Sequence, residues 1–148
     1  MNTRICLGIL AIAIVFSAGC RTGEYKVDLD IYKQMPGVLV AEPSLPDYLA
    51  KNEDGSIKVS FEKGEMFLWL RTGSSMDEDT RKKVVSKALE LFHQQYMDNP
   101  DNRRGNGTFF RQKVVVRGYV EDIELYIVEW DMSLEHPNMV KDRSANYI

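Results

Sequence analysis

The sequence predicts an α+β domain of two layers, in which a mostly antiparallel sheet of four or five strands carries one long helix on one face. Two segments, 57–71 and 109–131, alternate apolar and polar residues on either side of a turn, which predicts two hairpins. The stretch 76–97 between them has helical periodicity, so the order is hairpin, helix, hairpin. The chain has 148 residues, 44% of them hydrophobic, which suits one such domain.

The first hairpin is predicted to turn at residues 63–64. This register places Phe61 opposite Met66 and Val59 opposite Leu68, and these apolar residues then share one face of the sheet. The other face pairs polar residues with aromatic ones: Ser60 with Phe67, and Lys58 with Trp69.

The predicted helix covers residues 76–97. Ser75 and Glu78 have the spacing of a capping box, and the helix is expected to end at Asn99-Pro100. Its apolar residues fall on one stripe, which comprises Val84, Val85, Ala88, Leu91 and Phe92.

The second hairpin is expected to turn at Glu121-Asp122 between strands 109–120 and 123–131. A regular register puts these residues on the helix-covered face: Val114, Val116, Val120, Ile123, Leu125 and Ile127, with Glu129 and Asp131 in the same phase. It puts these on the opposite face: Lys113, Val115, Arg117, Tyr119, Glu124, Tyr126, Val128 and Trp130.

The segments outside the hairpins have irregular patterns. We expect a tether over residues 20–36, a short strand near 37–41, a helical turn near 45–50 and a C-terminal tail from about residue 132. The globular domain is thus predicted to span residues 37–148.

The first nineteen residues have the layout of a secretory signal peptide. Arg4 supplies the positive charge, and the apolar run Ile5 to Phe16 is too short to span a bilayer, which needs about 20 apolar residues. The segment Ser17-Ala18-Gly19-Cys20 that follows resembles the lipobox of bacterial lipoproteins.

The resemblance implies cleavage before Cys20 and acylation of its thiol, with palmitate among the acyl chains. Cys6 would be lost with residues 1–19, so the mature chain would hold no free thiol. Two or three acyl chains hold a protein at a membrane, at roughly 0.8 kcal/mol per buried CH₂. Since Arg21 rather than Asp follows the cysteine, the resemblance favours the outer membrane over the inner membrane.

One face of the predicted sheet is a candidate binding surface, because it interleaves aromatic rings with cations that can bind by stacking and cation–π contacts. Its residues are Lys58, Phe67, Trp69, Lys113, Arg117, Tyr126 and Trp130. The alternative is that the segments before Ile57 and after Asp131 fold over this face and bury it.

The net charge of −3, from 19 Lys and Arg against 22 Asp and Glu, argues against a nucleic-acid partner. The sequence predicts a non-catalytic, lipid-anchored envelope protein that binds a protein or a cell-wall component such as a glycan, with no cofactor and no metal site. One alternative is an envelope hydrolase or enzyme subunit that uses Glu129 and Asp131, whose burial would raise their pKa values. A third is a purely structural lipoprotein.

Overall fold

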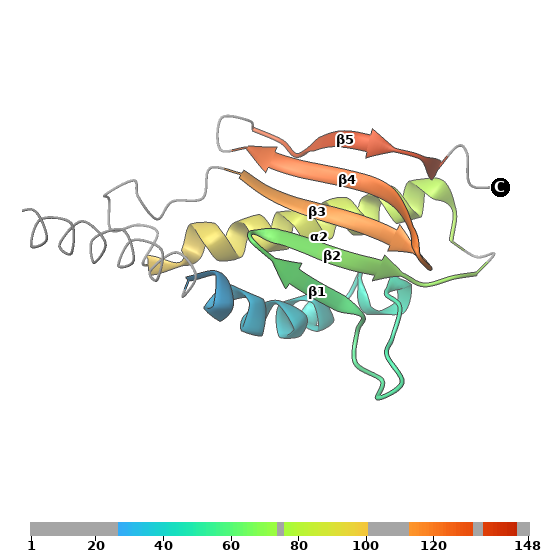
Figure 1. The fold of residues 1–148 in the computed structure, drawn as a ribbon, viewed down its shortest axis with the longest axis horizontal. Helices are drawn as coiled ribbons and strands as arrows, with labels where there is room; N and C mark the ends of the chain where they lie inside the picture. Colours follow the sequence, from blue (N-terminus) through green and yellow to red (C-terminus); the bar gives the residue numbers. More distant parts are fainter. Residues whose placement is uncertain (1–26, 74–75, 101–112, 132–134, 145–148) are drawn as a thin grey trace, which may run out of the picture.

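The computed structural model describes residues 27–73, 76–100, 113–131 and 135–144. Its centre is a five-stranded sheet in the order β1-β2-β3-β4-β5 (Figure 1). The strands are β1 (Val59–Glu62), β2 (Glu65–Leu70), β3 (Lys113–Val120), β4 (Ile123–Asp131) and β5 (Asn138–Asp142). Only β2 and β3 pair in parallel, and α2 (Glu78–Asp98) connects them. The predicted α+β class and mostly antiparallel sheet are confirmed.

Two helices cover the same face of this sheet, α2 and a helix over residues 27–41, and a short 3-10 helix, η1 (Pro46–Tyr48), follows the second of them (Figure 1). We call the opposite face of the sheet the outer face. The core lies between sheet and helices, where Phe92 of α2 contacts Phe61 of β1 and Tyr32 of the 27–41 helix, at ring-centroid distances of 6.0 and 6.4 Å.

The 27–41 helix corrects two predictions, because a tether was expected over residues 20–36 and a strand near 37–41. Val27, Ile31, Met35 and Leu39 recur every four residues and are all buried. The burial of each of these side chains stabilises the fold by roughly 1.5–3 kcal/mol. Their sum outweighs the roughly 3 kcal/mol that Pro36 costs inside the helix. The folded domain therefore includes residues 27–36.

The helix α2 matches the predicted position, but its N-cap is Asp77. The Asp77 carboxylate accepts a hydrogen bond from the backbone N–H of Thr80 at 2.7 Å, which satisfies a donor of the first turn. Tyr96 near the other end donates to the buried carboxylate of Asp28 at 2.7 Å. That hydrogen bond joins α2 to the 27–41 helix.

The first hairpin has the predicted register. Phe61 pairs with Met66 and Val59 with Leu68. Lys63 and Gly64 form the turn with φ angles of 49° and 80°, the positive values that a tight two-residue turn needs.

The second hairpin turns where predicted, but its register changes within β4. Tyr119 pairs with Glu124, whereas the preceding Gly118 pairs with Tyr126, so Leu125 is an additional residue in a β-bulge. Gly118 is closely surrounded, because a Cβ there would lie 2.8 Å from Val85 Cγ2 of α2 and 3.3 Å from the Tyr126 ring. The bulge places the Tyr126 ring over Gly118.

The bulge reverses the predicted faces for the rest of β4, since a shift of one residue exchanges the two sides of a strand. Tyr126, Val128 and Trp130 face the helices, and Ile127 and Glu129 lie on the outer face.

The predicted C-terminal tail from residue 132 contains a strand instead. β5 pairs antiparallel with β4 and forms one edge of the sheet. Lys82 of α2 forms a 2.7 Å ion pair with Asp142 of β5, which fixes this edge to the helix layer.

Candidate functional site

Three aromatic side chains lie together on the outer face, and we call them the aromatic cluster: Phe67 and Trp69 of β2 and Tyr119 of β3. Tyr119 stacks on Trp69 with ring centroids 5.2 Å apart and on Phe67 with centroids 6.3 Å apart. The ammonium of Lys58 lies 4.9 Å from the centre of the Trp69 ring, a cation–π contact. All three rings are half-buried, so each keeps part of its surface in contact with solvent.

A group of paired charges borders the aromatic cluster, and we call it the charged network: Glu65, Arg117, Glu124 and Lys141. The Arg117 guanidinium holds both oxygens of Glu65, at 2.8 and 3.4 Å, and contacts Glu124 at 3.2 Å. Lys141 donates to the other Glu124 oxygen, and Tyr119 joins the network by donating its hydroxyl to Glu124 at 3.0 Å.

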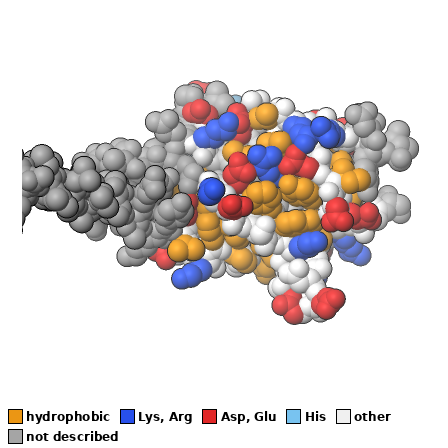
Figure 2. All heavy atoms as spheres, in the orientation of Figure 1, with side chains coloured by type: hydrophobic (Ala, Val, Ile, Leu, Met, Phe, Trp, Pro, Cys, Tyr) orange, Lys and Arg blue, Asp and Glu red, His pale blue; other side chains and the backbone are white. Residues whose placement is uncertain are grey.

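This pairing keeps the network ionised. Burial by itself raises the pKa of Glu124, but the hydrogen bonds from Lys141, Tyr119 and Arg117 outweigh it and lower that pKa below its ordinary value. The hydrogen bonds with Glu65 raise the pKa of Arg117. The outer face therefore presents fixed charges beside the rings (Figure 2), with hydrophobic side chains at its centre.

Five of the seven residues predicted for the binding surface lie on the outer face: Lys58, Phe67, Trp69, Lys113 and Arg117. The bulge turns Tyr126 and Trp130 to the helix side, so their assignment to this surface was wrong. Trp130 stacks there on His93 of α2. Tyr119 was predicted on this face but was not among the seven candidates, although its position opposite Trp69 makes it the centre of the cluster.

The two carboxylates of the enzyme alternative, Glu129 and Asp131, were predicted on the apolar face, and this placement was wrong. Glu129 lies on the outer face and forms an ion pair with Lys113. Asp131 pairs in register with Lys113 as well. Both residues therefore lie on the outer face, away from the helix-covered face on which the enzyme alternative placed them.

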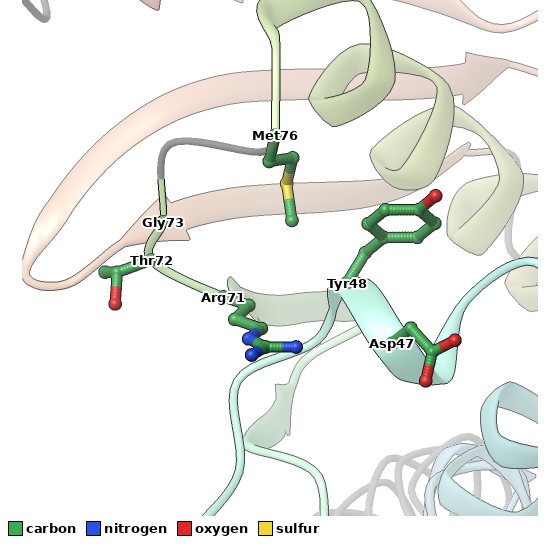
Figure 3. A pocket seen from close by; sticks show the side chains of 6 residues that line it. All are labelled: Asp47, Tyr48, Arg71, Thr72, Gly73 and Met76. Atoms are coloured by element: carbon green, nitrogen blue, oxygen red, sulfur yellow. The ribbon is translucent and has the colours of Figure 1, made fainter.

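A cavity of about 270 Å³ lies at the carboxyl end of β2, where the chain crosses to α2 (Figure 3). Its lining comes from η1, from the residues after β2 and from the start of the α2 segment: Asp47, Tyr48, Arg71, Thr72, Gly73 and Met76. This cavity was not predicted from the sequence, because three separate segments contribute and none of them carries a recognisable motif.

A second cavity of about 450 Å³ lies beside Trp130, between the outward side of α2 and the residues that precede β5. His136 and Trp130 both line this cavity, and the Trp130 ring stacks on His93. The two histidines thus come near one indole, although the sequence offered no link between them.

Among the described residues, no group of three or more His, Cys, Asp or Glu side chains is arranged to hold a metal ion. No helix in the same part of the chain combines the length and the hydropathy needed to cross a membrane. Residues 1–19 and Cys20, the expected signal peptide and acylation site, lie outside the described residues. Comparisons with protein-family models, with curated proteins and with solved structures gave no match.

Proposed function

We propose that this protein is a lipid-anchored component of the bacterial cell envelope whose domain binds a protein or cell-wall partner on its outer face. The aromatic cluster carries the binding part of this proposal: three half-buried rings lie on a sheet face that neither described helix covers. Aromatic and arginine side chains dominate the energy of many interfaces, and contiguous apolar patches often mark interaction sites.

The start of the folded domain supports an action close to the membrane. Residue 27 already belongs to a helix packed on the core, so residues 20–26 are the only link between Cys20 and the domain. Seven residues span at most roughly 25 Å when fully extended. A domain acylated at Cys20 would then meet its partner at the membrane surface.

The anchoring part is tested by incorporation of labelled palmitate in cells that express the full chain. We expect label in the wild type and none in Cys20→Ala. Label retained by Cys20→Ala would contradict the lipoprotein assignment.

The binding part is tested by photo-crosslinking in the native host. A photoreactive amino acid replaces Ser60, an exposed outer-face residue beside Phe67, or replaces Gln94, an exposed residue on α2, as the matched control. We expect adducts from position 60 that disappear in Trp69→Ala, and none from position 94. Equal adducts from both positions, or none from position 60, would instead favour the purely structural alternative.

A further inference from the structure

The charges on the described residues of the outer face balance one another. Three cations and three carboxylates among them pair: Arg117 with Glu65 and Glu124, Lys141 with Glu124, and Lys113 with Glu129. Glu62, in register with Glu65, lies 4.0 Å from Lys63 of the first turn. Lys58 at one end of the face and Asp131 at the other add one charge of each sign. A charged partner therefore meets little net attraction from these residues, since their positive and negative charges are equal in number and most of them are paired.

The same pairs oppose a partner that covers the whole face. A flat protein surface would remove water from the ions around Arg117 and Glu124, and the cost of dehydrating paired charges often equals or exceeds their mutual attraction. A narrow partner that lies over the rings would leave the outer sides of these ions hydrated.

The side chains beside the rings suit hydroxyl groups. Glu124 and Glu65 have further lone pairs that accept from a hydroxyl, and the Arg117 and Lys141 nitrogens donate to hydroxyl oxygens. The rings of Trp69 and Tyr119 offer π surfaces whose negative potential attracts the positively polarised C–H groups of a sugar.

We infer that the outer face binds an uncharged glycan chain, with the sugar rings over the aromatic cluster and their hydroxyls on the charged network. This inference rests on the proposed function, because it specifies the cell-wall partner of the same face.

Tryptophan fluorescence of the detergent-solubilised full mature chain tests it, because the two tryptophans lie on opposite sides of the sheet. Trp130→Phe leaves Trp69 as the reporter of the outer face, and Trp69→Phe leaves Trp130 as the matched control. The probes are four tetrasaccharides: N-acetylglucosamine and glucose tetramers, which are neutral, a glucosamine tetramer, which is cationic, and a galacturonic acid tetramer, which is anionic.

We expect a neutral tetramer to change Trp69 fluorescence and leave Trp130 unchanged. Its dissociation constant should vary by less than about twofold between roughly 0.05 M and 0.5 M salt, since a neutral ligand carries no net charge whose attraction salt could screen. The charged tetramers should bind at least about tenfold more weakly to the wild-type face.

Two matched variants test the charge balance itself. Arg117→Gln leaves one carboxylate in excess, because Glu65 loses its partner while Glu124 keeps Lys141, so the cationic tetramer should now bind, in a salt-dependent manner. Glu65→Gln gives the opposite excess and should favour the anionic tetramer.

The inference is overturned if neither neutral tetramer changes Trp69 fluorescence, or if a charged tetramer binds the wild type more tightly than both. Adducts from position 60 that depend on Trp69 would still uphold the proposed function in that case and would identify the partner as a protein. If both the adducts and the glycan binding are absent, the proposed function and the glycan inference are both rejected.

Discussion

Trp130 of β4 lies flat on His93 of α2, with ring centroids 4.1 Å apart and an angle of 7° between the ring planes. A regular β3-β4 hairpin would have placed this tryptophan on the other side of the sheet. The single additional residue at Leu125 therefore decides both the composition of the outer face and a contact between sheet and helix.

Deletion of Leu125 should keep the native fold at a lower stability. The deletion removes the bulge, and Tyr126 then follows Glu124 directly, so Gly118 still pairs with Tyr126 and these strands keep their faces. The loss of the buried Leu125 side chain should lower the free energy of unfolding by about 2–5 kcal/mol. Circular dichroism and urea unfolding measure the result.

Leu125→Ala is the control for this deletion, because it removes a buried side chain and keeps the register. It should lower the free energy of unfolding by about 2–5 kcal/mol and leave a cooperative transition. A deletion variant that loses its cooperative transition while Leu125→Ala keeps it would contradict this prediction and would show that the fold requires the bulge itself.

The parts of the fold that follow from local pattern were predictable. In the first hairpin, the alternation of apolar residues and a Gly-containing turn are together enough to determine the register of the strands. Phe61 pairs with Met66 as expected. In the second hairpin the alternation fits either register, and the choice depends on the fit of the Tyr126 ring over Gly118 beneath Val85. Contact with α2, distant in sequence, therefore decides the register there.

The residues of the candidate site likewise divide into those that the local pattern predicts and those that it does not. Lys58, Phe67, Trp69 and Arg117 precede the bulge or lie outside β4, and their shared face follows from alternation alone. Tyr126 and Trp130 follow the bulge and were assigned to the wrong face. The ion pairs of Arg117 with Glu65 and Glu124 depend on side-chain geometry, which alternation does not predict.

Gly118→Ala should destabilise the domain by about 1–3 kcal/mol, because the added methyl group would lie 2.8 Å from Val85 and the packed core has no room for it. Gly37→Ala is the matched control, since no atom lies within 4 Å of its added Cβ and the residue is helical. It should stabilise the domain by about 0.5–1 kcal/mol. Urea unfolding of both variants should thus give shifts of opposite sign, and a neutral Gly118→Ala would contradict the packing described for the bulge.

The 27–41 helix should contribute to the stability of the domain as a whole. Ile31 is 2% exposed and Leu29 is 55% exposed on the same helix. Ile31→Ala should lower the free energy of unfolding by about 2–5 kcal/mol, whereas Leu29→Ala should change it by at most about 0.5 kcal/mol. Equal, small effects in thermal or urea unfolding would mean that this segment is a tether after all.

Stability should fall in mildly acidic solution because of His93. Burial lowers the pKa of this imidazole below its ordinary value of 6.5, so the folded state favours the neutral form. The unfolded chain takes up a proton near pH 6.5 and binds more protons than the folded state below that pH. The free energy of unfolding should therefore be constant above about pH 7 and decrease as the pH falls from about 6.5 to 5.5.

His93→Phe isolates this effect, since it keeps a ring against Trp130 and removes the titrating group. The His93 Nε2 atom is buried and makes no hydrogen bond with any described residue, so the variant loses no such bond. Urea unfolding, followed by Trp130 fluorescence in a Trp69→Phe background, should show a shallower decrease between pH 6.5 and 5.5 in His93→Phe. His136→Phe changes an exposed histidine and should retain the full decrease. If His136→Phe flattens the profile and His93→Phe does not, the pH dependence arises from the cavity that His136 lines rather than from the stack of His93 on Trp130.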